Sequence, residues 1–124
     1  MTKLLVLVVD DNLVSRLLPS FILRQFSEQV QVIECETGAD ALGFLETHHV
    51  THVLLDISMP DLDGIGVVQA IRRMTKPDGL QVLAYTADAF AVNKVNLESI
   101  GFNGVLLKPL KSDDLIEVLG IDRL

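Results

Sequence analysis

The stretch HVLLDISMP, residues 52–60, ends an apolar run on a single carboxylate, Asp56, and a proline follows four residues later. A short aliphatic run such as Val53–Leu55 is typical of a buried strand. An ionised carboxylate at the end of a buried strand is costly to desolvate unless a positive charge or hydrogen bonds compensate for it. The stretch therefore predicts a strand whose last position holds an acidic group for its chemistry.

The same change between apolar runs and helical spacing continues along the whole chain. Predicted strands cover 3–9, 30–35, 51–56, 80–85 and 103–108, and predicted helices cover 12–26, 37–48, 63–74, 88–100 and 112–119. Because the strands are apolar on both faces, we expect them to be buried on both sides, as in a parallel sheet covered by helices. The pattern predicts a doubly wound α/β domain, in which ligands bind beyond the carboxyl ends of the strands.

Local signals mark the ends of the predicted helices. Four polar residues are expected to act as N-caps: Asn12, Thr37, Asp63 and Ser112. Gly101 and Gly120 are expected to close the last two helices. Pro19 falls inside the first helix, where it removes one backbone hydrogen bond and should bend the axis.

Composition limits the class of protein. The 124 residues, 49% of them hydrophobic, suit one globular domain. The formal charge of −7 argues against direct binding to nucleic acid, whose phosphates require a basic face. The apolar run at residues 4–9 is too short for a signal peptide or a membrane span, and the only cysteine, Cys35, excludes an internal disulfide. We therefore expect a soluble, cytoplasmic protein.

Reactive side chains stand at the ends of the predicted strands. Asp10 and Asp11 follow the first strand, Asp56 follows the third, Thr86 the fourth and Lys108 the fifth. Carboxylates gathered at one edge repel each other by about 4 kcal/mol per pair at 4 Å and an effective dielectric constant near 20. Lys108 offsets part of this repulsion, and Mg²⁺ suits the remainder because it prefers carboxylate and phosphoryl oxygens. The pattern predicts a magnesium site that handles phosphate, with Asp56 as nucleophile.

These residues resemble the receiver domain of response regulators in two-component signalling. The resemblance rests on VLVVDDN (6–12), HVLLDISMPDLDG (52–64), VLAYTA (82–87) and GVLLKPL (104–110). It implies a flavodoxin-like sheet of five parallel strands in the order 2-1-3-4-5 with five helices. It also implies one receiver domain over residues 1–124 without an output domain, either a single-domain regulator or the receiver of a hybrid histidine kinase.

The resemblance assigns the metal and the phosphoacceptor. Asp56 would accept a phosphoryl group from a phosphohistidine of a sensor histidine kinase or a histidine phosphotransfer domain. Asp11 and Asp56 would bind Mg²⁺ directly with the backbone carbonyl of Ser58, and Asp10 would hold the metal through water. Such a protein is not an enzyme acting on other substrates, because it catalyses only its own phosphorylation and dephosphorylation.

The resemblance also assigns the groups that bind and report the phosphoryl group. Lys108 would bind it, placed by a cis peptide bond before Pro109. Thr86 would move toward it as a switch. The second switch position usually carries Tyr, Phe or His, but here it is Val105, which has no ring to swing and one stiff torsion. We therefore expect a weaker or different response on the face formed by residues 88–119, or a domain that mainly relays phosphate.

Partner contacts are expected at two places. In the family, donor helices dock beside the active edge, which here corresponds to Val14, Leu18, Pro109 and Leu110. The face formed by the fourth helix, fifth strand and fifth helix allows a homodimer.

Two other functions use the same residue types. An aspartate-nucleophile, phosphatase-like hydrolase would also join aspartates, lysine and Mg²⁺, but its strand 1 would be expected to carry Asp-x-Asp rather than adjacent aspartates. A pseudo-receiver would bind partners without phosphorylation, which the complete acidic set argues against. The three histidines, His48, His49 and His52, are expected to lie in a solvated loop, and Cys35 to be a small buried residue.

Overall fold

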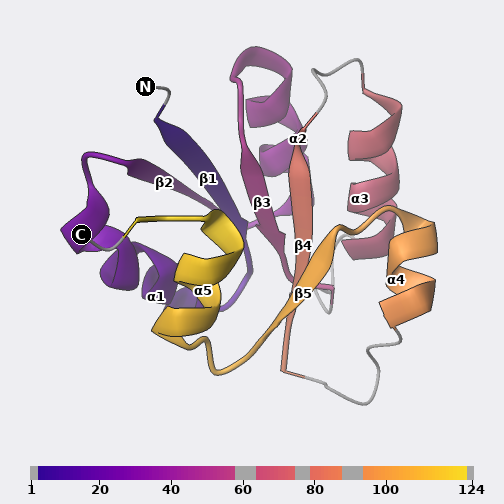
Figure 1. Cartoon of the computed structure of the whole chain (residues 1–124). Helices are drawn as coiled ribbons and strands as arrows, with labels where there is room; N and C mark the ends of the chain where they lie inside the picture. Colours follow the sequence, from indigo (N-terminus) through magenta and orange to yellow (C-terminus); the bar gives the residue numbers. More distant parts are fainter. Residues whose placement is uncertain (1–2, 58–63, 75–78, 88–93, 123–124) are drawn as a thin grey trace.

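The computed structural model describes residues 3–57, 64–74, 79–87 and 94–122, and these form a parallel sheet between two layers of helices (Figure 1). The strands are β1 (Leu4–Val9), β2 (Val30–Cys35), β3 (His52–Leu55), β4 (Gln81–Thr86) and β5 (Gly104–Leu107). The helices are α1 (Leu13–Leu23), followed by a 3₁₀ turn at Arg24–Phe26, α2 (Gly38–Thr47), α3 (Gly64–Arg73), α4 (Lys94–Ile100) and α5 (Ser112–Leu119). The strand order β2-β1-β3-β4-β5 confirms the predicted doubly wound, flavodoxin-like fold.

The register of the sheet brings the carboxyl ends of the strands together. Val9 lies opposite Leu55, and Leu55 lies opposite Ala84, so β1, β3 and β4 end at nearly the same height. Each of the four neighbouring strand pairs is parallel, and β1, β3, β4 and β5 run toward the lower edge of the molecule in Figure 1. The residues that directly follow these strands therefore meet at one edge, as parallel topology predicts.

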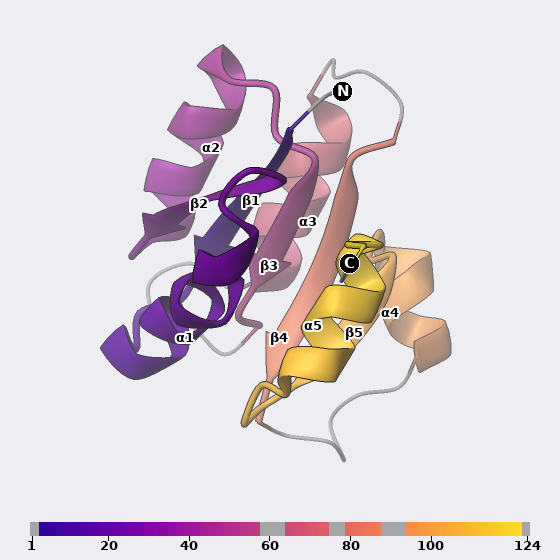
Figure 2. The same cartoon turned by 60° about the vertical axis from the view of Figure 1, so that its left-hand side comes forward.

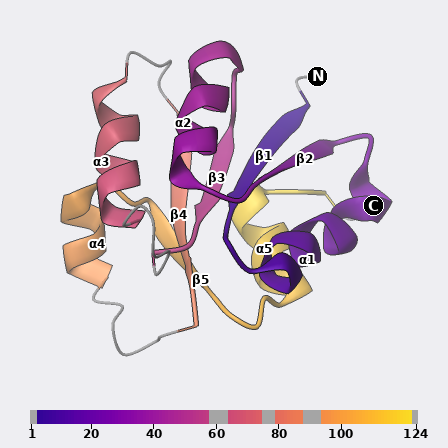
Figure 3. The ribbon, with the colours of Figure 1, turned by 180° about the vertical axis from the view of Figure 1, so that it is seen from behind.

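Each face of the sheet packs against its own group of helices. On one face, Val53 and Val82 pack with α2, α3 and the segment Leu97–Phe102. On the other, Val8 and Leu54 pack with Leu23 of α1 and the buried side of α5. Figure 2 shows α1 and α5 in front of the sheet with α3 behind it, and Figure 3 shows the molecule of Figure 1 from behind. This double burial explains why the strands read as continuous apolar runs.

Most of the predicted helix ends are confirmed, with one correction. The side chains of Asn12 and Thr37 accept hydrogen bonds from the backbone three residues on, and Gly120 closes α5 in the left-handed conformation with φ of 67°. The prediction that Ser112 caps α5 is wrong, because Lys111 is the N-cap and Ser112 is the first helical residue. Instead, the carboxylates of Asp113 and Asp114 in the first turn interact favourably with the positive end of the helix dipole. Asp63 lies outside the described residues.

The prediction that His48, His49 and His52 all lie in a solvated loop is wrong for His52. His48 and His49 are exposed, but His52 is only 8% exposed because it is the first residue of β3 and pairs with both neighbouring strands. Its Nδ1 lies 2.9 Å from Thr51 Oγ1. Burial lowers the pKa of His52, since the charged imidazolium is poorly solvated there. Among the described helices, none has the length and apolar character that crossing a bilayer requires.

The lowered pKa of His52 predicts a loss of stability on mild acidification. The unfolded chain protonates its histidines near pH 6.5, while folded His52 resists protonation, so the free energy of unfolding falls as the pH drops through that value. Chemical denaturation at about pH 7.5 and about pH 5.5 should show a smaller pH effect in His52→Gln than in the native chain. The exposed-site variant His49→Gln should keep the native pH effect, and an equal reduction in both variants would contradict the assignment.

Candidate acidic site at the carboxyl edge of the sheet

Three carboxylates meet where β1 and β3 end. One oxygen each from Asp10, Asp11 and Asp56 lies within 4.8 Å of the others. Backbone hydrogen bonds extend the sheet to two of these residues, from the Asp10 N–H to the Cys35 carbonyl (3.1 Å) and from the Asp56 N–H to the Val9 carbonyl (3.0 Å). Asp10 is fully buried and Asp56 is 5% exposed, whereas Asp11 is exposed. The cluster therefore opens to solvent on the side of Asp11.

Lys108 brings the positive charge to this cluster from the far side of β4. Its backbone N–H donates to the Thr86 carbonyl at 2.8 Å, which fixes the start of the loop that leaves β5. Its ammonium lies 2.7 Å from Asp10 Oδ2 and 3.5 Å from Asp56 Oδ2. The Lys108–Pro109 peptide bond is cis, as predicted. Lys108 thus bridges the two buried carboxylates.

One lysine does not neutralise three carboxylates. Asp10 Oδ1 accepts a hydrogen bond from the Asn12 N–H at 2.9 Å, but its buried Oδ2 faces Lys108 without a well-directed hydrogen bond among the described residues. Two buried carboxylates and an exposed third, with net negative charge, provide the hard oxygen ligands that Mg²⁺ prefers. The donor set therefore fits this cation. The predicted carbonyl ligand at Ser58 lies outside the described residues.

Arg16 is a site residue that the sequence did not reveal. It lies on α1 and is 8% exposed, and its guanidinium donates to the Asp10 carbonyl at 3.0 Å. It also forms ion pairs with Glu34 at 3.4 Å and Glu36 at 3.5 Å. Arg16 therefore ties the turn that carries the aspartates to the end of β2. An arginine within an apolar helical pattern was the available signal.

The remaining predicted site residues are distributed around the cluster. Thr86 ends β4 and is 1% exposed. Val105 is partly buried on β5 and packs against the core on the α4 side of the sheet. On the expected docking surface, Val14 is 72% exposed, Leu18 is half-buried and Pro109 is exposed.

Leu110 departs from the expected docking surface. It is 7% exposed and belongs to the core between the sheet, α1 and α5. The chain turns inward after Pro109, so the Leu110 side chain stabilises the fold instead of facing a partner.

Gly64 fixes the backbone beneath Asp56. This first residue of α3 lies so close to β3 that an added Cβ would be 2.6 Å from Ile57 Cα and 2.7 Å from the Asp56 carbonyl oxygen. Both neighbours are backbone atoms, which cannot rotate away. Only glycine lets α3 approach the phosphoacceptor candidate this closely.

The fold and this site agree with a known family. The family model for the response regulator receiver domain matches residues 6–120, so the chain belongs to the receiver domains. It is therefore a phosphoacceptor domain of signal transduction, and the alternatives of a hydrolase or a pseudo-receiver are not favoured.

Relatives of known function are larger proteins. The chain is 33% identical to the sensor histidine kinase RcsC of Escherichia coli over 94% of its own length and 12% of that protein. It is 33% identical to the transcription factor SKN7 of Saccharomyces cerevisiae over 92% of its length and 18% of that protein. The chain thus spans less than a fifth of these relatives.

Solved structures with the same fold include a metal-bound receiver. The receiver domain of the sensor histidine kinase PA1611 from Pseudomonas aeruginosa, solved with a magnesium ion in its active-site cleft, is 27% identical. The alignment covers 95% of each chain with a TM-score of 0.82. The chemotaxis response regulator CheY4 of Vibrio cholerae is 25% identical, with a TM-score of 0.83 over 96% of this chain and 98% of that one.

The close approach at Gly64 predicts a strong effect of one methyl group. Gly64→Ala should lower the free energy of unfolding by about 1–3 kcal/mol, because it overpacks α3 against the Asp56 backbone. Gly66→Ala is the matched control in the same helix, since its Cβ would meet nothing within 4 Å, and it should stabilise by about 0.5–1 kcal/mol. Urea denaturation of both variants tests the contrast, and equal effects would contradict it.

Proposed function

We propose that Asp56 accepts a phosphoryl group from a phosphohistidine in a reaction that requires Mg²⁺. The observation that supports this most strongly is the buried pair Asp10 and Asp56 bridged by the Lys108 ammonium. Asp11 and Asp56 would bind the cation directly, with the backbone carbonyl of Ser58, and Asp10 would hold it through water. Bound Mg²⁺ would supply positive charge to the phosphoryl oxygens and reduce the repulsion among the aspartates.

The residues of the chain divide the chemistry among them. The Asp56 carboxylate forms a bond to phosphorus as the bond from phosphorus to the imidazole nitrogen breaks, and the imidazole leaves with the electron pair. The Lys108 ammonium, already within 3.5 Å of Asp56, moves onto a phosphoryl oxygen and stabilises the spreading charge. The Thr86 hydroxyl at the end of β4 donates a hydrogen bond to another phosphoryl oxygen. The same site returns the group to water or to a second histidine.

The donor would dock on α1, beside the site. Leu13, Val14 and Phe21 are 57%, 72% and 69% exposed, which is unusual for large apolar side chains on one short helix. A hollow of about 350 Å³ lined by Phe21, Ile22, Arg24, Gln25 and Ser112 lies between this surface and the start of α5. Because α1 begins directly after the acidic turn, a helix of a sensor histidine kinase or a histidine phosphotransfer domain seated there brings its phosphohistidine to Asp56. Because its phosphoryl donors would act in the cytoplasm, we expect the protein to be cytoplasmic.

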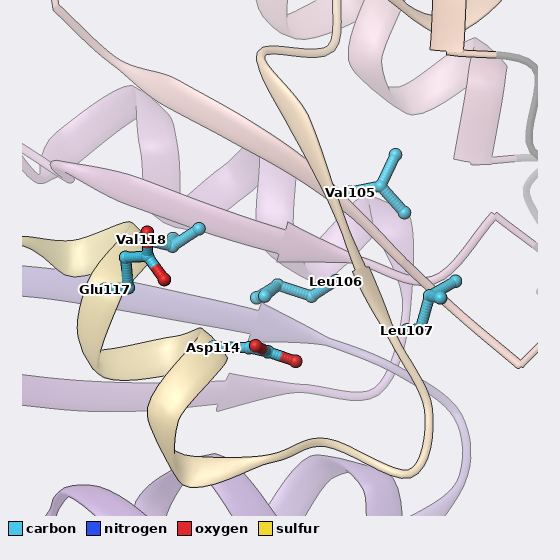
Figure 4. A pocket seen from close by; sticks show the side chains of 6 residues that line it. All are labelled: Val105, Leu106, Leu107, Asp114, Glu117 and Val118. Atoms are coloured by element: carbon cyan, nitrogen blue, oxygen red, sulfur yellow. The ribbon is translucent and has the colours of Figure 1, made fainter.

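The response to phosphorylation would differ from one based on a swinging aromatic ring. Val105 and Leu106 point to opposite sides of β5, and both line a groove together with Leu107 (Figure 4). The other wall of the groove is formed by Asp114, Glu117 and Val118 of α5. Valine has one stiff torsion, so movement of Thr86 changes this face little. The apolar part of the groove offers a surface for a second copy of the chain, while its two acidic residues favour a partner that contributes basic side chains.

The phosphoacceptor assignment predicts a covalent adduct at one residue. Incubation with acetyl phosphate and Mg²⁺ should add a single phosphoryl group by intact mass, and Asp56→Asn should abolish it. Asp11→Asn should slow the reaction strongly, whereas Glu46→Gln, an exposed carboxylate on α2, should leave it unchanged. A persistent adduct in Asp56→Asn would contradict the assignment. Steady turnover of phosphate esters without an adduct would indicate a hydrolase, and failure to bind beryllofluoride would indicate a pseudo-receiver.

Val105 predicts a small conformational response. Amide chemical shifts with and without beryllofluoride should change near Asp56 and Thr86 but little across α4 and β5. Val105→Tyr should enlarge the changes there, because it provides a ring that can exchange between two positions. Leu107→Tyr, two residues along the same strand and 45% exposed, is the matched control. Large shifts across α4 in the native chain would contradict the prediction.

A further inference from the structure

Tyr85 lies between the site and α1 and has no role in the chemistry described above. It precedes Thr86 on β4, is 1% exposed and packs in the core under α1 and α5. The Lys108 ammonium lies 4.8 Å from the centre of its ring. At the other end of the ring, its hydroxyl donates to the Ser15 carbonyl of α1 at 3.0 Å. Tyr85 therefore contacts both the site lysine and the helix that carries the exposed apolar surface.

Pro19 leaves the acceptor on α1, the Ser15 carbonyl, without its usual helical donor. In an α-helix the Ser15 carbonyl would accept from the N–H of the residue four positions later, but that residue is Pro19, which has no N–H. The Tyr85 hydroxyl donates to this carbonyl. The ring is thus held at both ends, by β4 at its backbone and by α1 at its hydroxyl, which fixes its position 4.8 Å from the Lys108 ammonium.

The face of the ring suits the task of holding an ammonium ready. It attracts a cation through its quadrupole and takes up none of the three N–H donors of the ammonium. Those donors stay available for Asp10, Asp56 and an incoming oxygen. Burial, together with the charges of Asp10 and Asp56, raises the pKa of Tyr85 to about 12, so the hydroxyl keeps its proton at neutral pH.

We propose that Tyr85 is a positioning residue that holds the Lys108 ammonium between Asp10 and Asp56 while α1 holds Tyr85. The proposal rests on the function proposed for Lys108 as the group that binds the phosphoryl oxygen. It links the phosphoryl-binding lysine to the donor-docking helix by two consecutive contacts, from Lys108 to Tyr85 and from Tyr85 to Ser15 of α1.

The first test separates the ring from the hydroxyl. Tyr85→Leu should weaken beryllofluoride binding and slow phosphorylation by acetyl phosphate about three- to tenfold, the loss expected for one cation–π contact. Tyr85→Phe keeps the ring and should stay within about twofold of the native chain. Mg²⁺ affinity, which depends on the aspartates, should be equal in all three.

The matched control is Phe102→Leu, a buried ring of the opposite core that is 3% exposed. It should lower the melting temperature without changing beryllofluoride affinity. The proposal is overturned if Tyr85→Leu binds beryllofluoride like the native chain, if Tyr85→Phe falls to the level of Tyr85→Leu, or if Phe102→Leu has the same effect as Tyr85→Leu.

The second test examines the anchor on α1 by a double-mutant cycle. Pro19→Ala restores an N–H four residues after Ser15, which competes with the Tyr85 hydroxyl for the same carbonyl. Tyr85→Phe should therefore lower the melting temperature in the native background and lower it less in the Pro19→Ala background. Equal losses in both backgrounds overturn the role of Pro19 in this anchor, and no loss in the native background overturns the anchor itself.

The third test does not depend on phosphorylation. Tyr85 is the only tyrosine and the chain has no tryptophan, so its emission reports its surroundings alone. Lys108→Ala should change the intensity of this emission, and Lys111→Ala, an exposed lysine nearby in sequence, should not. Unchanged emission in Lys108→Ala overturns the proposal, even in a protein that accepts phosphate. If the native chain takes neither phosphate nor beryllofluoride while the emission changes, the lysine contact stands and the proposed function fails.

Discussion

Repulsion among carboxylates at one edge is the constraint on which the site depends. The register of β1 and β3 leaves Asp10 and Asp56 side by side, and each close pair costs about 4 kcal/mol at 4 Å in a medium of dielectric constant near 20. The sheet supports this arrangement because its apolar strands are buried on both faces and continue in backbone hydrogen bonds to the aspartates. The Lys108 ammonium relieves part of the repulsion, and the remainder creates the demand for a cation.

The helix α1 contacts the site with its buried side and exposes apolar side chains on its outer side. Its buried side carries Arg16, which bonds the Asp10 carbonyl, and the Ser15 carbonyl, which accepts from Tyr85. Its outer side presents Leu13, Val14 and Phe21. A partner that shifts α1 therefore acts on the same helix that supports the acidic turn. On the docking proposed above, recognition and chemistry would share one element, and their coupling would be a property of the fold rather than of a flexible loop.

The sequence predicted the order and type of the elements because each strand is a continuous apolar run and each helix has its own periodicity. It predicted Asp10, Asp11, Asp56, Thr86 and Lys108 because parallel strands bring their ends to one edge. Contacts between residues of different helices and strands were harder to predict from the sequence. Arg16 and Tyr85 have no local signal for their partners, and Leu110 turns inward after a proline. His52 was expected to be solvated although it lies within a predicted strand, and it is buried at the start of β3. Ser112 was predicted to be the N-cap of α5 because serine is a common N-cap, but Ser112 is already the first helical residue.

The order β2-β1-β3-β4-β5 also leaves two strands with an unpaired side, and such edges invite main-chain pairing with other molecules. Both are protected. β5 has only four residues, and β2 exposes Gln31 and Glu34, the second of which is held by Arg16. Growth of the sheet by an added strand is thus disfavoured at either end. So apolar a sheet is thereby less prone to main-chain pairing between copies of the chain.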